Sequence, residues 1–138
     1  MWESQPTDVF KRKLEWYTKK RPKELEWALR NLNTYLGQLD EGVNPLQIVK
    51  LRFVHNEHNG IYAVDQKGGP KNLAEIRLYL FPHVPSKTLH LLTIGDKNSQ
   101  SRDINDCRAM VKEINTSEEK RNERASEPEP PEDESQIS

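Results

Sequence analysis

Residues 74–81, AEIRLYLF, alternate between apolar and mixed side chains with a period of two. This alternation predicts a β-strand, because successive side chains of a strand point to opposite faces of a sheet. The face that carries Ile76 and Leu80 is purely apolar, so we expect it to pack on helices. The opposite face carries Arg77 and Tyr79, which we therefore expect on the more open side of the sheet.

Three further stretches near this strand have the pattern or composition of strands, and they are residues 49–53, 61–65 and 88–94. Pro82 and Pro85 are expected to bound the central strand, and Gly95 to close the last one. Short turns separate the last three strands. The sequence therefore predicts an antiparallel meander of three or four strands.

Two amphipathic helices are expected before the strands, the first over residues 8–20 and the second beginning at Pro22. Gly37 or Gly42 is expected to end the second helix. One or two connecting residues make the pair an αα-hairpin. A last helix is expected over about residues 102–113. The fold class is thus α+β: an N-terminal αα-hairpin packed on a three- to four-stranded antiparallel sheet with a C-terminal helix.

Charge divides the 138 residues into two parts. Residues 1–116 carry 18 Lys/Arg and 14 Asp/Glu, a net charge of +4, whereas residues 117–138 carry three bases and eight acids, a net charge of −5. Every aromatic residue of the Trp, Tyr and Phe types precedes residue 82. We therefore expect one domain over 1–116 and a disordered acidic tail over 117–138. The +4 body is compatible with a nucleic-acid partner.

Several classes of protein are disfavoured by the sequence. Cys107 is the only cysteine, so neither an intramolecular disulfide nor a cysteine-based metal site is expected. No apolar run approaches the roughly 18–20 residues that span a bilayer, and the N-terminus has no signal-peptide pattern. We expect no membrane association and a cytoplasmic location. Phosphate-loop, dinucleotide-binding and zinc-helix motifs are absent, and no metal or small-molecule cofactor is expected.

The residues that suggest chemistry are basic or able to transfer protons. His55, Glu57 and His58 lie within four residues of one predicted turn, and Lys97 lies in the loop after the last strand. Each has an ordinary alternative, because turn residues and strand-to-helix loops commonly have this composition. For Arg77 the alternative is a cross-strand ion pair with an acid.

Together these groups match a reaction that needs no metal. The 2′-hydroxyl of RNA attacks the adjacent phosphate when a base removes its proton and cations stabilise the charge. Arg77 and Lys97 are the candidate phosphate ligands, Glu57 or His55 is the candidate base, and a His or Tyr is the candidate acid. Further contacts to RNA are expected from Lys50, Arg52, Tyr79, His90 and Gln100.

Two segments, with the order of elements, resemble the RelE/ParE superfamily of toxins from type II toxin–antitoxin pairs. They are residues 75–79, EIRLY, and residues 91–100, LLTIGDKNSQ, and the resemblance covers roughly residues 8–114. It implies a toxin that cleaves mRNA on the ribosome and is neutralised by a cognate antitoxin protein. Arg77 matches the phosphate-binding arginine of the family, and Lys97 falls in its basic loop. Glu57 and His55 correspond loosely to acid/base positions.

One departure from the family keeps other functions open. RNA-cleaving members place a Tyr or His near the C-terminal helix, whereas this chain has neither beyond His90. The general acid must then be His90, Tyr79 or His83, or cleavage is weak or absent. The long N-terminal helices are also similar to those of ParE-like members, which inhibit DNA gyrase. A noncatalytic RNA- or protein-binding domain of the same fold is the third possibility.

Overall fold

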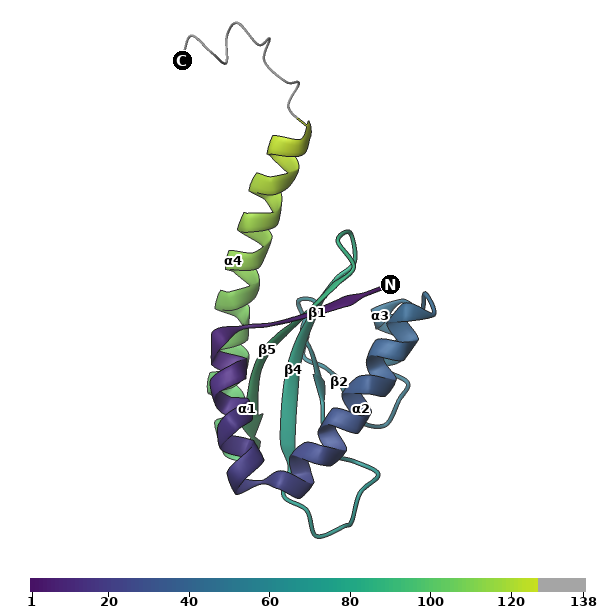
Figure 1. Cartoon of the computed structure of the whole chain (residues 1–138), viewed down its shortest axis with the longest axis vertical. Helices are drawn as coiled ribbons and strands as arrows, with labels where there is room; N and C mark the ends of the chain where they lie inside the picture. The colour runs from purple at the N-terminus through teal and green to yellow at the C-terminus, as the bar shows by residue number, and fades with distance from the viewer. Residues whose placement is uncertain (127–138) are drawn as a thin grey trace, which may run out of the picture.

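The computed structural model describes the backbone of residues 1–126 and the side chains of residues 1–123. Its five strands form one mixed sheet in the order β1-β5-β4-β3-β2. Their bounds are β1 Glu3–Pro6, β2 Val54–Asn56, β3 Tyr62–Val64, β4 Ile76–His83 and β5 Thr88–Asp96. The main helices are α1 Asp8–Lys20, α2 Pro22–Asp40 and α4 Gln100–Ser126, with a short α3 Pro45–Ile48 and a 3-10 turn η1 Lys97–Ser99. The α+β class is confirmed (Figure 1).

Strand β4 is buried on both faces. Leu78 and Leu80 belong to the core beneath α1 and α2, whereas Tyr79 and Phe81 belong to a second core with Cys107 of α4. The expectation that Tyr79 lies on a more open face is wrong, because its side chain is fully buried. The C-terminal helix covers that face, so the sheet has helices on both sides.

The antiparallel part of the sheet extends further than expected. Residues Ile76–His83 of β4 pair with Thr88–Asp96 of β5, so Pro82 and Gly95 lie inside strands and do not bound them. The register shifts by one residue after Tyr79, which leaves Leu92 as a bulge. Because of this bulge, Ile94 joins Leu89 and Leu91 in the first core, whereas Leu92 belongs to the second.

The N-terminal strand β1 was not expected from the sequence. It pairs in parallel with β5, from Glu3 opposite Thr88 to Pro6 opposite Leu91, and makes the sheet mixed. Its three exposed side chains, from Glu3 to Gln5, have no apolar alternation that would predict a strand. Backbone pairing fixes it in place, together with the buried Trp2, whose backbone N–H donates to Asp40 Oδ1 at 2.7 Å, and the Thr7 hydroxyl, which donates to the carbonyl of Leu92 at 2.7 Å.

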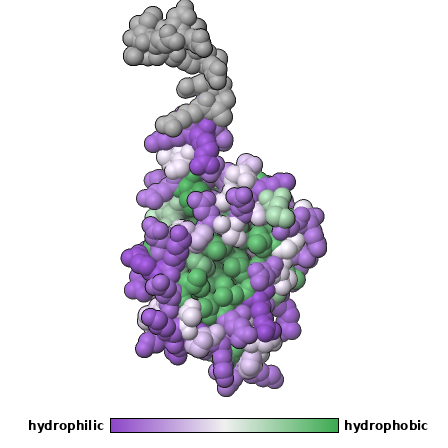
Figure 2. All heavy atoms as spheres, in the orientation of Figure 1, coloured by the Kyte–Doolittle hydropathy of each residue, from purple (hydrophilic) through white to green (hydrophobic). Residues whose placement is uncertain are grey.

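Helices α1 and α2 begin and end close to the expected residues. The Thr7 hydroxyl accepts from the N–H of Phe10 and caps α1, Pro22 opens α2, and Gly42 with φ of +89° follows its end. The two helices meet at Arg21 and then diverge, rather than lying side by side as a hairpin (Figure 1). Figure 2 shows apolar side chains gathered on the surface between them.

The strand expected over residues 49–53 is wrong. Asn44 caps α3 through a bond from the N–H of Leu46, and turn hydrogen bonds follow from Leu51 to Ile48 and from Val54 to Leu51. Leu51 and Phe53 still pack against the first core. The apolar alternation therefore arises from a turn that folds onto the core, and the strand β2 begins only at Val54.

Helix α4 is longer than the expected helix over 102–113. Its apolar contacts end at Ile114, yet the helix continues to Ser126 through polar residues and projects from the body (Figure 1). The Glu118–Arg121 ion pair at i,i+3 and a high content of helix-forming residues suit such an exposed helix. Residues 117–126 of the expected disordered tail are thus helical, and residues 127–138 lie outside the described part. None of the described helices has the length and hydropathy that crossing a membrane requires.

Gly95 is predicted to be essential for the packing of α4 on β5. A Cβ atom at this position would overlap the Asp103 carboxylate and lie 2.9 Å from Ser99 Oγ. We expect Gly95→Ala to lower the free energy of unfolding by about 1–3 kcal/mol in urea denaturation. The control is Gly37→Ala within α2, where a Cβ meets nothing within 4 Å. That change should raise stability by about 0.5–1 kcal/mol. Equal effects of the two changes would contradict this account.

Candidate functional site

Arg77 is held between two carboxylates. Its Nη1 lies 3.1 Å from Glu57 Oε1, and its Nε lies 3.0 Å from Glu75 Oε1. The side chains of Arg77 and Glu57 are only 14% and 7% exposed, so this is a largely buried pair. Arg77 therefore forms ion pairs with acids, as the alternative from the sequence anticipated, but the acids lie just after β2 and just before β4 and not on a neighbouring strand. The two carboxylates use Nε and Nη1 of the guanidinium and neutralise much of its charge.

His55 forms a second polar group with Asp65 and Lys67. Its Nε2 lies 2.6 Å from Asp65 Oδ2, and Lys67 Nζ lies 3.6 Å from the same oxygen. Asp65 is buried, whereas the His55 ring is 23% exposed. The backbone N–H of Lys67 also donates to Asp65 Oδ1 at 2.8 Å. A carboxylate held this way orients the imidazole, which is how a His base is commonly positioned.

The strand register places these two groups on one face. His55 pairs with Ala63, and Ala63 pairs with Tyr79, which belongs to the core beneath α4. Arg77 lies two residues before Tyr79 in β4 and so points to the same side. We define the sheet-edge cluster as His55, Glu57, Asp65 and Arg77. It unites three of the four predicted catalytic residues.

Lys97 and Gln100 lie at the end of β5. Lys97 is exposed in η1, and within residues 1–123 no hydrogen bond or ion pair joins it to Arg77 or Glu57. Gln100 is half-buried at the start of α4. The N–H groups of Asn98 and Ser99 donate to the Asp96 carboxylate. The loop therefore satisfies its own donors.

Tyr79 borders the sheet-edge cluster but is buried. Its hydroxyl makes no hydrogen bond to any described residue. Burial, and next the charges of Glu57 and Asp103, raise the pKa of the phenol. The group therefore stays protonated at neutral pH. It can donate a hydrogen bond inside the protein, but it has no exposed surface from which to contact RNA.

His90 and His83 lie at the opposite end of the β4–β5 pair. His90 stacks on Phe81 with ring centroids 5.8 Å apart, and burial lowers its pKa. It lines a cavity of about 360 Å³ between β1 and α4. His83 contacts Ser86 Oγ at 2.7 Å. Because Phe81 and Arg77 are four residues apart along β4, neither histidine is near the sheet-edge cluster, and both are poor candidates for its acid.

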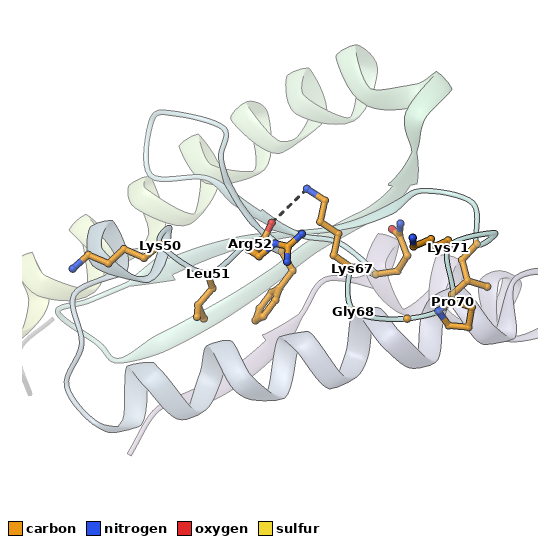
Figure 3. A pocket seen from close by; sticks show the side chains of 11 residues that line it. Lys50, Leu51, Arg52, Lys67, Gly68, Pro70 and Lys71 are labelled. Carbon is orange, nitrogen blue, oxygen red and sulfur yellow. Dashed lines mark hydrogen bonds between the residues drawn. The ribbon is translucent and has the colours of Figure 1, made fainter.

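Lys50 and Arg52 line a groove beside the β2–β3 edge of the sheet, on a different side from the sheet-edge cluster. A hollow of about 710 Å³ separates residues 50–53 from residues 66–73 (Figure 3). Lys67 and Lys71 line its other wall, and no Asp or Glu is among the lining residues. We call these four side chains and the hollow between them the basic groove. Lys67 belongs to it and also contacts Asp65, so it links the groove to the sheet-edge cluster.

Three functional candidates were missed from the sequence: Asp65, Lys67 and Lys71. Asp65 ends the strand pattern at residues 61–65 and precedes a turn, where an acid is ordinary. Its contact with His55 depends on the pairing of β2 with β3, which the incorrect strand at 49–53 obscured. The remaining signal, a second basic segment at residues 67–71, is too common to identify a site by itself.

Comparison with known proteins identifies no relative of the chain. No family model, curated protein or solved structure matches it. Within the described residues, no three His, Cys, Asp or Glu side chains are grouped closely enough to hold a metal ion.

The Arg77–Glu57 pair is predicted to be structurally coupled. Arg77→Met should lower the free energy of unfolding by about 2–4 kcal/mol, because it leaves the buried Glu57 carboxylate without its cation. The double variant Arg77→Met/Glu57→Gln should be more stable than Arg77→Met alone. Urea denaturation of both single variants and the double variant measures the coupling. Additive losses would show that the pair is not coupled.

Cys107 is predicted to be unreactive in the folded protein. Burial, and next the charge of Asp103, raise the pKa of the thiol to about 12. Only the thiolate reacts, so at pH 8 about one molecule in ten thousand carries the reactive form. Labelling with a disulfide reagent should be slow in buffer and fast in urea, where the thiol regains its ordinary pKa. Equal rates in the two conditions would contradict the buried position.

Proposed function

We propose that this protein is a cytoplasmic toxin of the RelE/ParE type that binds RNA and cleaves it without a metal ion. The observation that supports the proposal is the sheet-edge cluster, where His55, Asp65, Glu57 and Arg77 share one face. It combines a partly exposed imidazole, an orienting carboxylate and two cations, Arg77 and the adjoining Lys67. These are the groups that cleavage at a 2′-hydroxyl requires.

In the proposed reaction His55 is the general base. Its imidazole removes the 2′-hydroxyl proton, the 2′ oxygen attacks the adjacent phosphorus, and the bond from phosphorus to the 5′ oxygen breaks. Asp65 stabilises the imidazolium that forms. The departing 5′ oxygen takes a proton from water, because Tyr79 is buried and His90 lies elsewhere. The products are a 2′,3′-cyclic phosphate and a 5′-hydroxyl end.

Glu57 is the less suitable base of the two candidates. It is nearly buried and its Oε1 is bound by Arg77. We assign it the positioning of the guanidinium. Lys67 is assigned the stabilisation of negative charge on the phosphate, since its ammonium lies beside Asp65 and the basic groove.

The partners in this proposal are mRNA on the ribosome and an antitoxin protein that blocks the toxin. Figure 2 supports a protein partner, because apolar side chains reach the surface between α1 and α2. The apolar residues packed against the first core include two partly buried ones on these helices, Leu14 of α1 and Leu36 of α2.

A noncatalytic RNA-binding protein is the second candidate. One observation favours it: Glu57 and Glu75 together neutralise Arg77, and the candidate acids Tyr79 and His90 are both buried. A protein of this kind would bind RNA through the basic groove and leave it intact.

His55→Asn tests the proposed reaction. We expect it to reduce the rate of RNA cleavage about 10²-fold or more, in the range that one acid–base group contributes, with RNA affinity within about twofold of the wild type. The matched control is His58→Asn in the turn that follows β2, where the exposed His58 has φ of 70° that Asn also tolerates. Growth inhibition and mRNA integrity after expression are measured for both. Full cleavage by His55→Asn would refute the assignment, and intact RNA with the wild type would select the noncatalytic function.

A further inference from the structure

The basic groove is built from two loops that the fold holds facing one another. The N–H of Asp65 donates to the carbonyl of Phe53 at 3.0 Å, and Lys67 Nζ donates to the carbonyl of Arg52 at 3.4 Å. Figure 3 shows this second bond crossing between the two walls. The groove is therefore a formed feature of the β2–β3 edge.

Glycines bring the second wall close to α2. A Cβ on Gly69 would lie 2.8 Å from ring atoms of Trp27, so only glycine fits this contact. Gly68 has φ of +99°, which also favours glycine. Asn31 of α2 fixes the start of the loop by donating to the carbonyl oxygens of Asp65 and Lys67 at 2.8 and 2.9 Å. The wall is thus pre-organised by packing and hydrogen bonds.

Three of the four cations in the groove have no acidic partner among the described residues. Lys67 is near Asp65, but among residues 1–123 no ion pair is formed by the other three cations, Lys50, Arg52 and Lys71. All three are exposed, and the groove has no acidic lining residue. Figure 3 shows them spread along the groove and not converging on one point. This spacing suits an extended polyanion better than a single small anion.

The size of the groove limits the occupant. A volume of about 710 Å³ lies in the range of single small-molecule sites, roughly 300–1,000 Å³, so the hollow has room for a few nucleotides of one strand. Lys67 connects this space to His55 through the shared Asp65 Oδ2 atom. Lys67 thus lies between the groove and the imidazole, in contact with the carboxylate that both share.

We propose that the basic groove binds the phosphate backbone of a single RNA strand and leads it to His55. The inference rests on the proposed function and assigns to it a substrate class, single-stranded RNA held through its phosphates. Lys50, Arg52 and Lys71 contact successive phosphates, and Lys67 contacts the one nearest the sheet-edge cluster. Binding depends on charge and carries little base preference.

The test measures binding separately from cleavage. A fluorescein-labelled 2′-O-methyl oligouridine has no free 2′-hydroxyl and cannot be cleaved, so its anisotropy with the full chain reports binding alone. The triple variant Lys50→Gln/Arg52→Gln/Lys71→Gln is compared with Lys11→Gln/Arg12→Gln/Lys19→Gln on the exposed side of α1. Each removes two Lys and one Arg, so the change of net charge is the same.

We expect the groove variant to bind at least tenfold more weakly at low salt and the α1 variant to stay within about threefold. The slope of log affinity against log salt should fall by about 2 in the groove variant, since each single-strand phosphate contact contributes about 0.7. Equal losses in the two variants would reduce the effect to net charge and overturn the inference. Lys71→Glu alone, at an exposed position, gives a second measurement if the triple variant folds poorly.

Competition identifies the occupant. Unlabelled single-stranded oligouridine should displace the probe, whereas polyglutamate or inorganic phosphate at matched charge should not. Displacement by polyglutamate would assign the groove to an acidic peptide, and displacement by phosphate to a single anion, and either result overturns the inference. The proposed function fails separately: if the wild type binds through the groove but leaves ordinary RNA intact, the groove assignment stands and the cleavage assignment falls.

Discussion

Burial of β4 on both faces is the constraint on which the rest of the structure depends. Leu78, Tyr79 and Leu80 are fully buried, so helices must cover the sheet on both sides. The helices α1 and α2 cover one side and α4 covers the other. Close approach of α4 to the sheet is possible because Gly95 has no side chain where Asp103 packs. The charged end of β4, at Glu75 and Arg77, is what remains for polar chemistry.

Three buried carboxylates fix the arrangement of polar side chains at that end of the sheet. Glu57, Asp65 and Asp103 each lie next to a cationic or histidine group, with partners Arg77, His55 and Lys13 respectively. An unpaired charge in these positions would cost several kcal/mol, of the order of 3–5, so each pair is maintained. The same pairing neutralises Arg77. Attraction of a polyanion must then come from cations elsewhere, and the basic groove contains them.

The proposed activity therefore divides between two neighbouring regions. The groove supplies uncompensated positive charge without acid–base groups, and the sheet-edge cluster supplies an oriented imidazole with little net charge. Lys67 belongs to both, because its ammonium contacts Asp65 and lines the groove. Such a separation lets affinity for RNA and the chemical step be altered independently.

The sequence by itself determined the α+β class, the ends of α1, the start of α2 and the apolar face of β4, because these depend on local periodicity and capping. It also selected Arg77, Glu57 and His55 as polar groups of one region. Tertiary structure decided what local patterns do not contain. Strand β1 exists only through its pairing with β5, residues 49–53 turn because α3 and the core hold them, and Tyr79 is buried because α4 folds over it. The contacts of His55 with Asp65 and of Lys67 with both regions join residues from different strands and loops, so only the folded chain brings them together.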